Sequence, residues 1–342
     1  SDYVLETVTV TGGEMIPDYA FVEMSSIKNV IIEGNSITTI GDNAFCNCTS
    51  LNKMEIADSV TKMGKNAFRN TAFSVLPSGK NLRNIGVNAF SECVNLVKIE
   101  IPSSYIEIDG YAFFNCMNLS EINLSTSIKS IGKNVFHNCV NLIEIDLPSS
   151  IVSIESGTFS GCEHLKRVNM PSTIRNIGEI SFFGCVNLEN FEFPASLSVI
   201  GCAAFTNCQK LTKVDIHKNI TTIAKGAFSH CNSLTDINVS PENNIYSSYN
   251  GVLYSKDQSF LLVYPAGKQD LSFVIPSTVK YLNDQAFYGV VYLSEVTIPS
   301  SIKDIGISAF SEMTSLRKVV TDFGINKLSK AAHDEKAYLS IV

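Results

Sequence analysis

Residues 128–148 read IKSIGKNVFHNCVNLIEIDLP, and variants of this stretch recur through most of the 342-residue chain. Its marker phenylalanine, Phe136 in this copy, recurs at intervals of 24, 23 and 22 residues, then six of 23, then 59, then 23. This period predicts a repeat architecture, and the interval of 59 predicts one insertion of 36 residues. The marker positions are Phe21, Phe45, Phe68, Phe90, Phe113, Phe136, Phe159, Phe182, Phe205, Phe228, Phe287 and Phe310.

Each repeat contains signals for a strand, a corner and a short turn. Residues 142–147 end in alternating apolar and polar positions, which predicts a short strand with one buried face, and Pro148 stops it. Gly132 permits a tight corner at which a side chain would clash. Phe136 and Cys139, three residues apart, face the same way in a brief helical or turn-like stretch. One repeat cannot bury its own apolar groups, so stacked repeats must share one core, as in a solenoid.

Residues 119–141 and 142–164 follow, with small departures, the pattern L-x-x-I-x-I/L-P-x-S-I-x-x-I-G-x-x-A-F-x-x-C-x-N. This pattern resembles the BspA-type leucine-rich repeat of microbial surface proteins, and the resemblance covers roughly residues 14–321. It implies a mainly β, curved solenoid of about twelve units of ~23 residues, with short strands on the concave face and turn or short helical segments elsewhere. It also implies a secreted or cell-surface protein that takes part in adhesion to host proteins or to other cells.

We expect a single solenoid domain over residues 1–342, with regular repeats at about 14–240 and 277–321. Residues 241–276 form the insertion and residues 322–342 a C-terminal cap, in which Ser329–Leu339 could form a short helix. The third unit carries Thr71 at the Cys position and is one residue short, which predicts a local kink. The terminal units are atypical, with Met24, Val290 and Met313 at the Cys position.

Composition excludes several classes of protein. The longest purely apolar stretch, Phe260–Tyr264, is too short for a transmembrane helix. A net charge of −7 repels nucleic acid and anionic membranes. With 45% hydrophobic residues and little Gly or Pro, the chain is neither disordered nor collagen-like. It begins at Ser1 without a leader, so we expect a processed or trimmed fragment whose targeting signal is missing.

Eight of the ten cysteines lie three residues after the marker phenylalanine, which predicts a buried column of inert thiols. Neighbouring repeats could bring these cysteines within disulfide reach, so some disulfide remains an alternative, and a metal site is a further one. Cys46 and Cys202 lie outside the column. The column members are Cys48, Cys93, Cys116, Cys139, Cys162, Cys185, Cys208 and Cys231.

No sequence motif indicates catalysis, and the five histidines show no ligand or base pattern, so we predict a non-enzymatic protein without cofactor or metal. The histidines are His137, His164, His217, His230 and His333.

Five Asn-x-Ser/Thr sequons either mark glycosylation or supply turn hydrogen bonds, and we favour hydrogen bonding because each repeat needs several corners. Asn118, just before the strand leucine, is expected to bond the turn backbone of its own or the adjacent repeat. The sequons are Asn47, Asn118, Asn123, Asn219 and Asn238.

Because side chains alternate along a strand, two columns of residues should point outward from the stacked strands and form a polar strip of roughly 45 Å. The strip suits protein recognition, although its columns could simply neutralise each other. Carboxylates interrupted by Asn on a flat strip do not wrap a calcium ion, and the strip has no aromatic side chain for sugar stacking. One column is Glu55, Glu100, Asn123, Asp146, Asn169, Glu192, Asp215 and Asn238; the other is Lys53, Lys98, Glu121, Glu144, Arg167, Asn190, Lys213 and Asp236.

The insertion gathers aromatic residues where the regular array breaks. Val252–Tyr254 and Phe260–Tyr264 flank a polar stretch, which predicts a β-hairpin. A similar hairpin occurs in members of the resembled family, which favours a structural embellishment over a recognition loop. Tyrosines are common interface anchors, so exposed Tyr246, Tyr249 and Tyr254 are candidate partner contacts.

We therefore expect an extracellular or cell-surface repeat module, monomeric and without a membrane span, that binds a protein partner, such as a host or matrix protein, along its concave strand face. Nucleic acid is not an expected partner. The alternative is a structural spacer or stalk that displays a region outside this sequence. An enzyme is the third class, and it would need a deep pocket lined by a nucleophile and a base.

Overall fold

The computed structural model describes residues 4–321 and divides the chain into two compact units, Ser1–Ile174 and Arg175–Val342, each described by itself below. The predicted C-terminal cap, with its short helix at Ser329–Leu339 and His333, lies outside the described residues.

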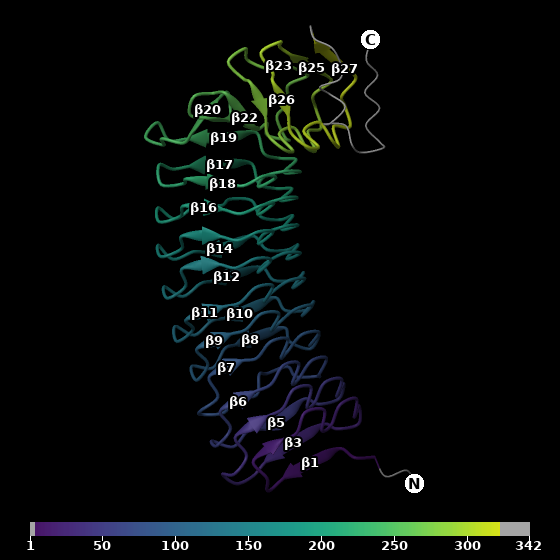
Figure 1. Cartoon of the computed structure of the whole chain (residues 1–342). Helices are drawn as coiled ribbons and strands as arrows, with labels where there is room; N and C mark the ends of the chain where they lie inside the picture. The colour runs from purple at the N-terminus through teal and green to yellow at the C-terminus, as the bar shows by residue number, and fades with distance from the viewer. Residues whose placement is uncertain (1–3, 322–342) are drawn as a thin grey trace. The chain divides into compact units, whose positions relative to one another are not determined.

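Both units are β-solenoids in which every repeat forms one turn, called a coil here (Figure 1). One row of parallel strands in the first unit contains β1 (Thr7–Val10), β3 (Asn29–Ile32) and β5 (Lys53–Glu55), then β8 (Lys98–Glu100), β10 (Glu121–Asn123), β12 (Glu144–Asp146) and β14 (Arg167–Asn169). Residues 23 apart are register partners, such as Ile122 and Ile99. In β5, β8, β10, β12 and β14 the central residue is buried and most flanking residues are exposed, as the alternation predicts.

A second row of two-residue strands precedes the corner glycine of most coils. In the first unit this row contains β2 (Met15–Ile16), β4 (Thr39–Ile40), β6 (Lys62–Met63), β7 (Asn84–Ile85), β9 (Glu107–Ile108), β11 (Ser130–Ile131) and β13 (Ser153–Ile154). In the second unit it contains β15 (Asn176–Ile177), β16 (Val199–Ile200), β18 (Thr222–Ile223), β24 (Tyr281–Leu282) and β26 (Asp304–Ile305).

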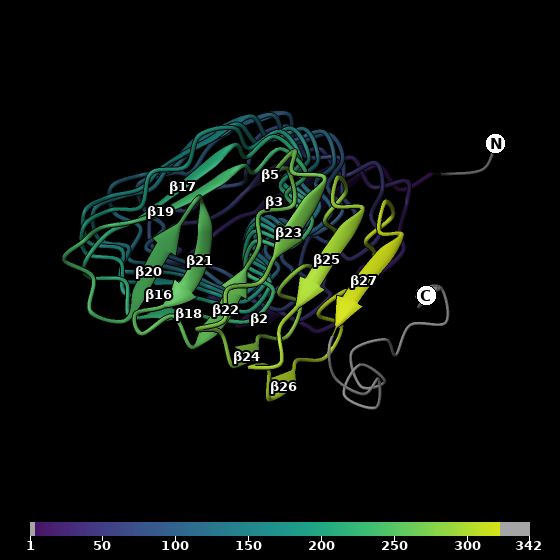
Figure 2. The same cartoon turned by 90° about the horizontal axis from the view of Figure 1, so that it is seen from above.

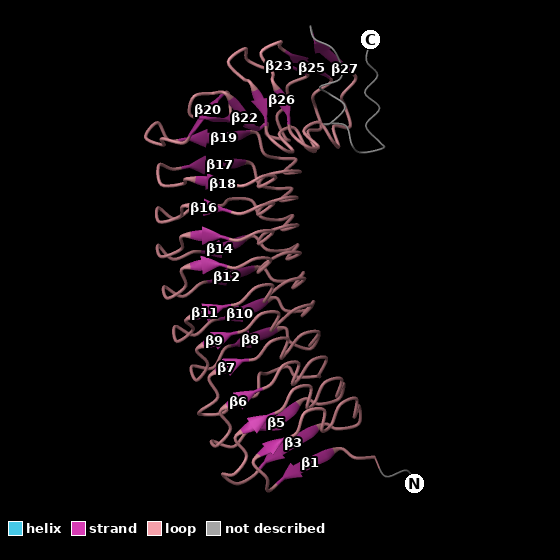
Figure 3. Ribbon diagram, in the orientation of Figure 1, coloured by secondary structure: helices cyan, strands magenta, loops and turns pink. Residues whose placement is uncertain are grey.

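The remaining part of each coil is a turn segment, and residues 4–321 contain no helix, so the short helical segments allowed by the sequence do not form (Figure 3). Asn134 and Asn138, on either side of Phe136, have φ angles of 54° and 58°. This left-handed backbone is incompatible with an α-helix, and Asn tolerates it better than most residues. The N–H groups of Asn134, Phe136 and Asn138 instead donate to carbonyl oxygens of the next coil at 2.8–2.9 Å. The need for two left-handed positions in each turn explains the abundance of Asn.

The core is built around stacked marker phenylalanines. From Phe21 to Phe159, neighbouring rings lie 5.1–6.0 Å apart with planes within 14° of parallel. In the second unit, Tyr264 stacks on Phe287 at 5.2 Å, and its N–H donates to Ala286 as a marker phenylalanine would. Tyr264 therefore holds the marker position of a further coil, 36 residues after Phe228 and 23 before Phe287. The predicted insertion of 36 residues is too long, because this stretch contains an ordinary period and only 13 residues exceed it.

The corner glycine is required by the neighbouring coil. A Cβ atom on Gly132 would lie 2.5 Å from the backbone nitrogen of Gly110 and 2.9 Å from the carbonyl carbon of Asp109. The predicted steric reason for this glycine is confirmed, and the clash is with backbone atoms that cannot rotate away.

The third coil is irregular, as the sequence indicated. It contributes no strand to the row of β5 and β8, since only the short strands β6 and β7 lie between these two in the chain. Phe73 packs edge-on against Phe68, with ring centroids 5.5 Å apart. The hydroxyl of Tyr105 reaches into this coil and donates to the carbonyl oxygen of Pro77 at 2.8 Å. The side chain of Thr71, in the Cys position, donates to the carbonyl oxygen of Phe68.

The second unit contains β17 (Lys213–Ile216) and β19 (Asp236–Val239), which pair in parallel. The predicted hairpin is confirmed: β21 (Val252–Ser255) and β22 (Phe260–Val263) pair antiparallel, and β20 (Tyr246–Tyr249) adds a third strand (Figure 2). Strand β22 then pairs in parallel with β24, so the insertion continues the short-strand row. A further parallel sheet contains β23 (Ser272–Val274), β25 (Glu295–Ile298) and β27 (Lys318–Thr321).

Candidate functional site

The outward-facing residues of β8, β10, β12 and β14 form a polar surface on the first unit, called the strand strip here. Parallel pairing in register places its residues in two columns, with Glu121 beside Lys98 and Asn123 beside Glu100. The expected arrangement of these eight residues is thus present within one sheet. They are Lys98, Glu100, Glu121, Asn123, Glu144, Asp146, Arg167 and Asn169.

Much of the strand strip is paired internally. The ammonium group of Lys98 lies 2.9 Å from the Glu121 carboxylate, and the Arg167 guanidinium lies 2.8 Å from Glu144. The side-chain amide of Asn169 donates to Asp146. The side chains of Glu100 and Asn123, which are register neighbours, have no hydrogen bond or ion pair within residues 4–321. The strip therefore keeps one carboxylate and one amide open to a ligand.

Other predicted strip residues lie elsewhere. Lys53 and Glu55 are on β5, in a separate sheet, and form an ion pair of 3.0 Å with each other. In the second unit, Lys213 lies 2.9 Å from Asp215, and Asn238 donates to Asp215 at 3.0 Å. Partial burial disfavours the charged form of Asp215, but the bonds from Asn238 and Lys213 outweigh it and lower the pKa of this carboxyl.

Glu192 is exposed but does not lie on a strand, so the expectation of a strand there is wrong. The neighbouring residues Phe191 and Phe193 both turn their rings edge-on to Phe205, with centroids 4.8 and 5.8 Å apart. With both aromatic side chains packed against one ring, this segment departs from the alternation of a strand.

The insertion tyrosines do not form one exposed group. Tyr249 is 62% exposed, whereas Tyr246 and Tyr254 are buried, so the expectation of exposure is wrong for these two. Tyr246 accepts a hydrogen bond from the backbone N–H of Ile223. Burial raises the pKa of Tyr254 to about 12. Tyr254 is buried because it packs in the core with Leu261 and Tyr264, so a partner cannot reach it.

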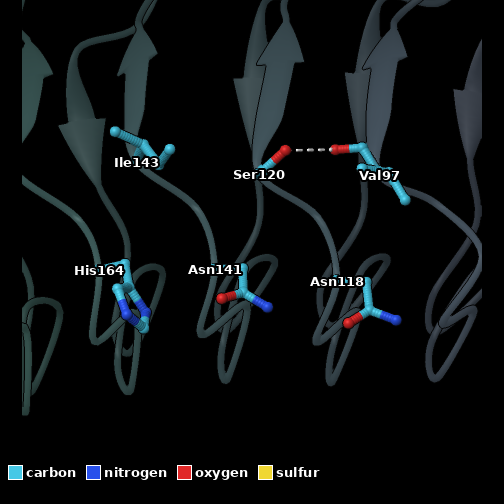
Figure 4. Close-up of a pocket in the computed structure, with 6 residues that line it drawn as sticks. All are labelled: Val97, Asn118, Ser120, Asn141, Ile143 and His164. Carbon is cyan, nitrogen blue, oxygen red and sulfur yellow. Dashed lines mark hydrogen bonds between the residues drawn. The ribbon is translucent and has the colours of Figure 1, made fainter.

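A shallow groove of about 380 Å³ runs beside the strand strip, at the start of its strands (Figure 4). Val97 and Ile143 line it and are 47% and 45% exposed, although both are aliphatic. Ser120, between them in the stack, donates to the carbonyl oxygen of Val97 at 3.1 Å. We call this surface the pre-strand groove; it is lined by Val97, Asn118, Ser120, Asn141, Ile143 and His164.

Side chains that line the pre-strand groove form hydrogen bonds from one coil to the next. Asn118 and Asn141 each donate at 2.9 Å to a carbonyl oxygen of the preceding coil, and a ring nitrogen of His164 lies 2.9 Å from the next such oxygen. The predicted role of Asn118 is therefore confirmed. The groove itself was missed, although comparing Val97 and Ile143 at the same repeat position could have revealed exposed apolar residues.

The cysteines form the predicted buried column, and all ten are free thiols in the structure. Thiols of the column donate to the carbonyl oxygen of the marker phenylalanine one coil earlier, as Cys116 does to Phe90 at 3.1 Å. Burial raises the pKa of Cys48 and of Cys93 to about 11. Such thiols are poor nucleophiles and poor metal ligands.

The histidines in the described part of the chain serve structural roles. His137 stacks under Phe114 with ring centroids 5.1 Å apart, and burial lowers its pKa. Burial also lowers the pKa of His230, and a ring nitrogen of His217 lies 3.1 Å from the carbonyl oxygen of Pro194. Among residues 4–321, no group of three or more His, Cys, Asp or Glu side chains could hold a metal ion.

Residues 4–321 contain no helix that is long and apolar enough to cross a bilayer.

The sequence matches the BspA type leucine-rich repeat region, in six copies, over residues 14–143, 129–253 and 268–342. The crystal structure of a leucine-rich repeat protein from Bacteroides ovatus is 22% identical, with a TM-score of 0.64 and coverage of 91% of this chain and 86% of that one. A leucine-rich cell surface protein from Faecalibacterium prausnitzii is 25% identical, with a TM-score of 0.44 and coverage of 92% and 69%. No curated protein matches the sequence. Because the family match extends over most of the residues, this chain belongs to the BspA-type leucine-rich repeat family.

Proposed function

We propose that the chain is a non-catalytic module that binds a protein partner through the strand strip and the pre-strand groove of its first unit. The observation that carries this proposal is the position of an exposed apolar groove beside an unpaired carboxylate and amide. Val97 immediately precedes Lys98 of β8, and Glu100 and Asn123 lie at the other end of the same strands without partners. An apolar centre with a polar rim is the usual anatomy of a protein interface.

The exposure of its side chains indicates which parts of this surface contribute affinity and which contribute specificity. Val97 and Ile143 would lose accessible apolar area on binding, which favours association. The paired side chains, such as Lys98 and Glu121, are solvent-exposed and contribute more to selecting a partner by charge than to affinity. We therefore expect the apolar groove to provide affinity and the open acidic position at Glu100 to provide specificity.

The proposed location is outside the cell, secreted or on the cell surface, and the proposed process is adhesion. Support for both comes from the family association described above. A host matrix or serum protein is the class of partner that this location would provide.

The experiment uses the chain as bait for serum and matrix proteins, identifies what is retained by mass spectrometry, and measures the affinity of the purified partner by calorimetry. The double variant Glu100→Lys/Asp146→Lys should weaken binding at least about tenfold, because it reverses two charges on the strip. Glu14→Lys/Glu33→Lys makes the same charge change on exposed residues outside the strip and should leave the affinity unchanged. Equal affinity of the strip variant and the wild type would contradict the proposed surface.

The alternative is a structural spacer, and the internal pairing of the strip favours it. Lys98 with Glu121 and Arg167 with Glu144 satisfy each other without a ligand. A spacer predicts that the chain retains no protein above the level of a charge-matched control repeat protein, so the same capture experiment separates the two functions.

A further inference from the structure

The turn segments of three consecutive coils in the first unit enclose a cleft of about 290 Å³ that has no part in the strand strip. This volume is close to the lower limit of typical small-ligand sites, about 300 Å³. Its lining combines two amides, one ion pair and two aromatic rings, a mixture that a purely structural surface does not need. The lining includes Asn66, Arg69, Asn88, Glu92, Tyr111 and Phe114.

The first unusual feature is the type of residue at position 111. Its φ of 62° is left-handed, and the same position in the neighbouring coils is held by Asn88 and Asn134, with φ of 55° and 54°. A bulky residue in this region is disfavoured, whereas Asn tolerates it. A strained residue retained at a cleft is a reason to look for function there.

The second feature is a group of aromatic rings outside the core. The Tyr111 ring meets the Phe114 ring at 62° with centroids 5.8 Å apart, and the Phe114 ring stacks on His137. Both Tyr111 and Phe114 are only partly buried. The repeat position of Phe114 is occupied by Ser91 in the preceding coil, so the fold does not require an aromatic side chain there.

The polar side of the cleft offers hydrogen-bonding groups without net charge. The Arg69 guanidinium donates to the Glu92 carboxylate at 2.7 Å, so their charges cancel. The carboxamide of Asn88 and the hydroxyl of Tyr111 make no hydrogen bond within residues 4–321. Together these groups present free donors and acceptors next to an apolar ring.

We propose that this cleft binds a neutral saccharide. The C–H face of a pyranose ring would pack on Tyr111 and Phe114, and its hydroxyl groups would bond to Asn88 and to the remaining donor and acceptor positions of Arg69 and Glu92. An acidic sugar fits less well, because the only cation of the lining is already paired and the chain carries a net charge of −7. This site is independent of the protein-binding surface on the strands.

The test is saturation-transfer NMR on the full chain with four neutral probes: maltotriose, lactose, mannobiose and chitobiose. The wild type should bind at least one of them with a Kd of about 1 mM, the range expected for a small exposed cleft. Tyr111→Asn should weaken that binding at least about tenfold, while its melting temperature stays equal or rises, because Asn suits the left-handed backbone. Phe114→Ser should weaken binding similarly.

Tyr19→Asn is the matched control. Tyr19 holds the same repeat position, has a φ of 59° and is 61% exposed, but it does not line the cleft. This variant should bind the sugar like the wild type. Failure of all four probes to bind, or equal binding by Tyr111→Asn, would overturn the proposal. Loss of the captured protein partner in Tyr111→Asn would also overturn it and assign the cleft to protein recognition instead.

Discussion

The thiol of Cys139 donates a hydrogen bond of 3.2 Å to the carbonyl oxygen of Phe113, which belongs to the preceding coil. Cys162 bonds to Phe136 in the same way, so each bond links a cysteine to the marker residue of its neighbour. The cysteine column therefore connects neighbouring coils through hydrogen bonds and apolar contacts, and its thiols remain protonated inside the core.

The thiols should be almost unreactive until the protein unfolds. Titration with a thiol reagent in denaturant without reductant should detect ten thiols, the full number of cysteines. In the native state only Cys202, the one cysteine that is not fully buried, should react readily. A Cys202→Ser variant provides the control, because it should abolish the rapid native reaction. Fewer than ten thiols after unfolding would contradict the free-thiol column.

Stability should fall in alkaline solution. Burial raises the pKa of Cys93 from 9.0 to about 11, and burial also raises that of Cys139 well above 9.0. Between pH 9 and about 11 the unfolded thiols lose protons while the native thiols keep theirs, so the stabilisation present below pH 9 is lost as the pH rises.

Thermal melts at increasing pH should show this loss begin near pH 9. Between pH 9 and about 11, the free energy of unfolding of the Cys93→Ala variant should fall less steeply than that of the wild type. The difference in slope should be up to about 1.4 kcal/mol per pH unit. The same slope in both proteins would show that Cys93 does not contribute.

Replacing the corner glycine should destabilise the first unit. Gly132→Ala places a methyl group 2.5 Å from the backbone nitrogen of Gly110, and we expect the free energy of unfolding to fall by about 2 kcal/mol or more. Gly12→Ala, which meets nothing within 4 Å, should change stability by less than about 0.5 kcal/mol. Urea denaturation measures both, and equal midpoints would disprove the steric role.

Relieving backbone strain should stabilise the second unit. Ile180 has a φ of 47°, which is costly for a β-branched side chain, and Ile180→Asn should raise the free energy of unfolding by about 1 kcal/mol. Ile307→Asn makes the same chemical change at a residue that is 66% exposed and lacks a left-handed backbone. It should have an effect below about 0.5 kcal/mol. A lower melting temperature for Ile180→Asn would contradict this account.

The solenoid was predictable from the sequence because every repeat places the same residue types in the same environment. The residues that correspond to Phe136 and Cys139 are buried in most coils, and Gly132 is needed because a Cβ atom there would meet the backbone of the adjacent corner. The hairpin of β21 and β22 was predictable from local alternation and a polar turn. The absence of helix was less visible, since it depends on the left-handed backbone at Asn134 and Asn138.

The candidate sites depended on contacts between coils, which the period alone does not specify. Tyr264 lies one period before Phe287, but the stacking of its ring on Phe287 was needed to show that a tyrosine takes the marker position. Tyr254 proved to be buried only because its strand packs into the core beside Leu261 and Tyr264. The cleft beside Tyr111 and Phe114 exists because Asn88 and Arg69, from the two preceding coils, lie next to these rings. The sequence by itself determined the fold of each coil, because a coil is formed by residues that are close in the chain. The tertiary structure alone decided which side chains of different coils meet, because packing sets their orientation and exposure.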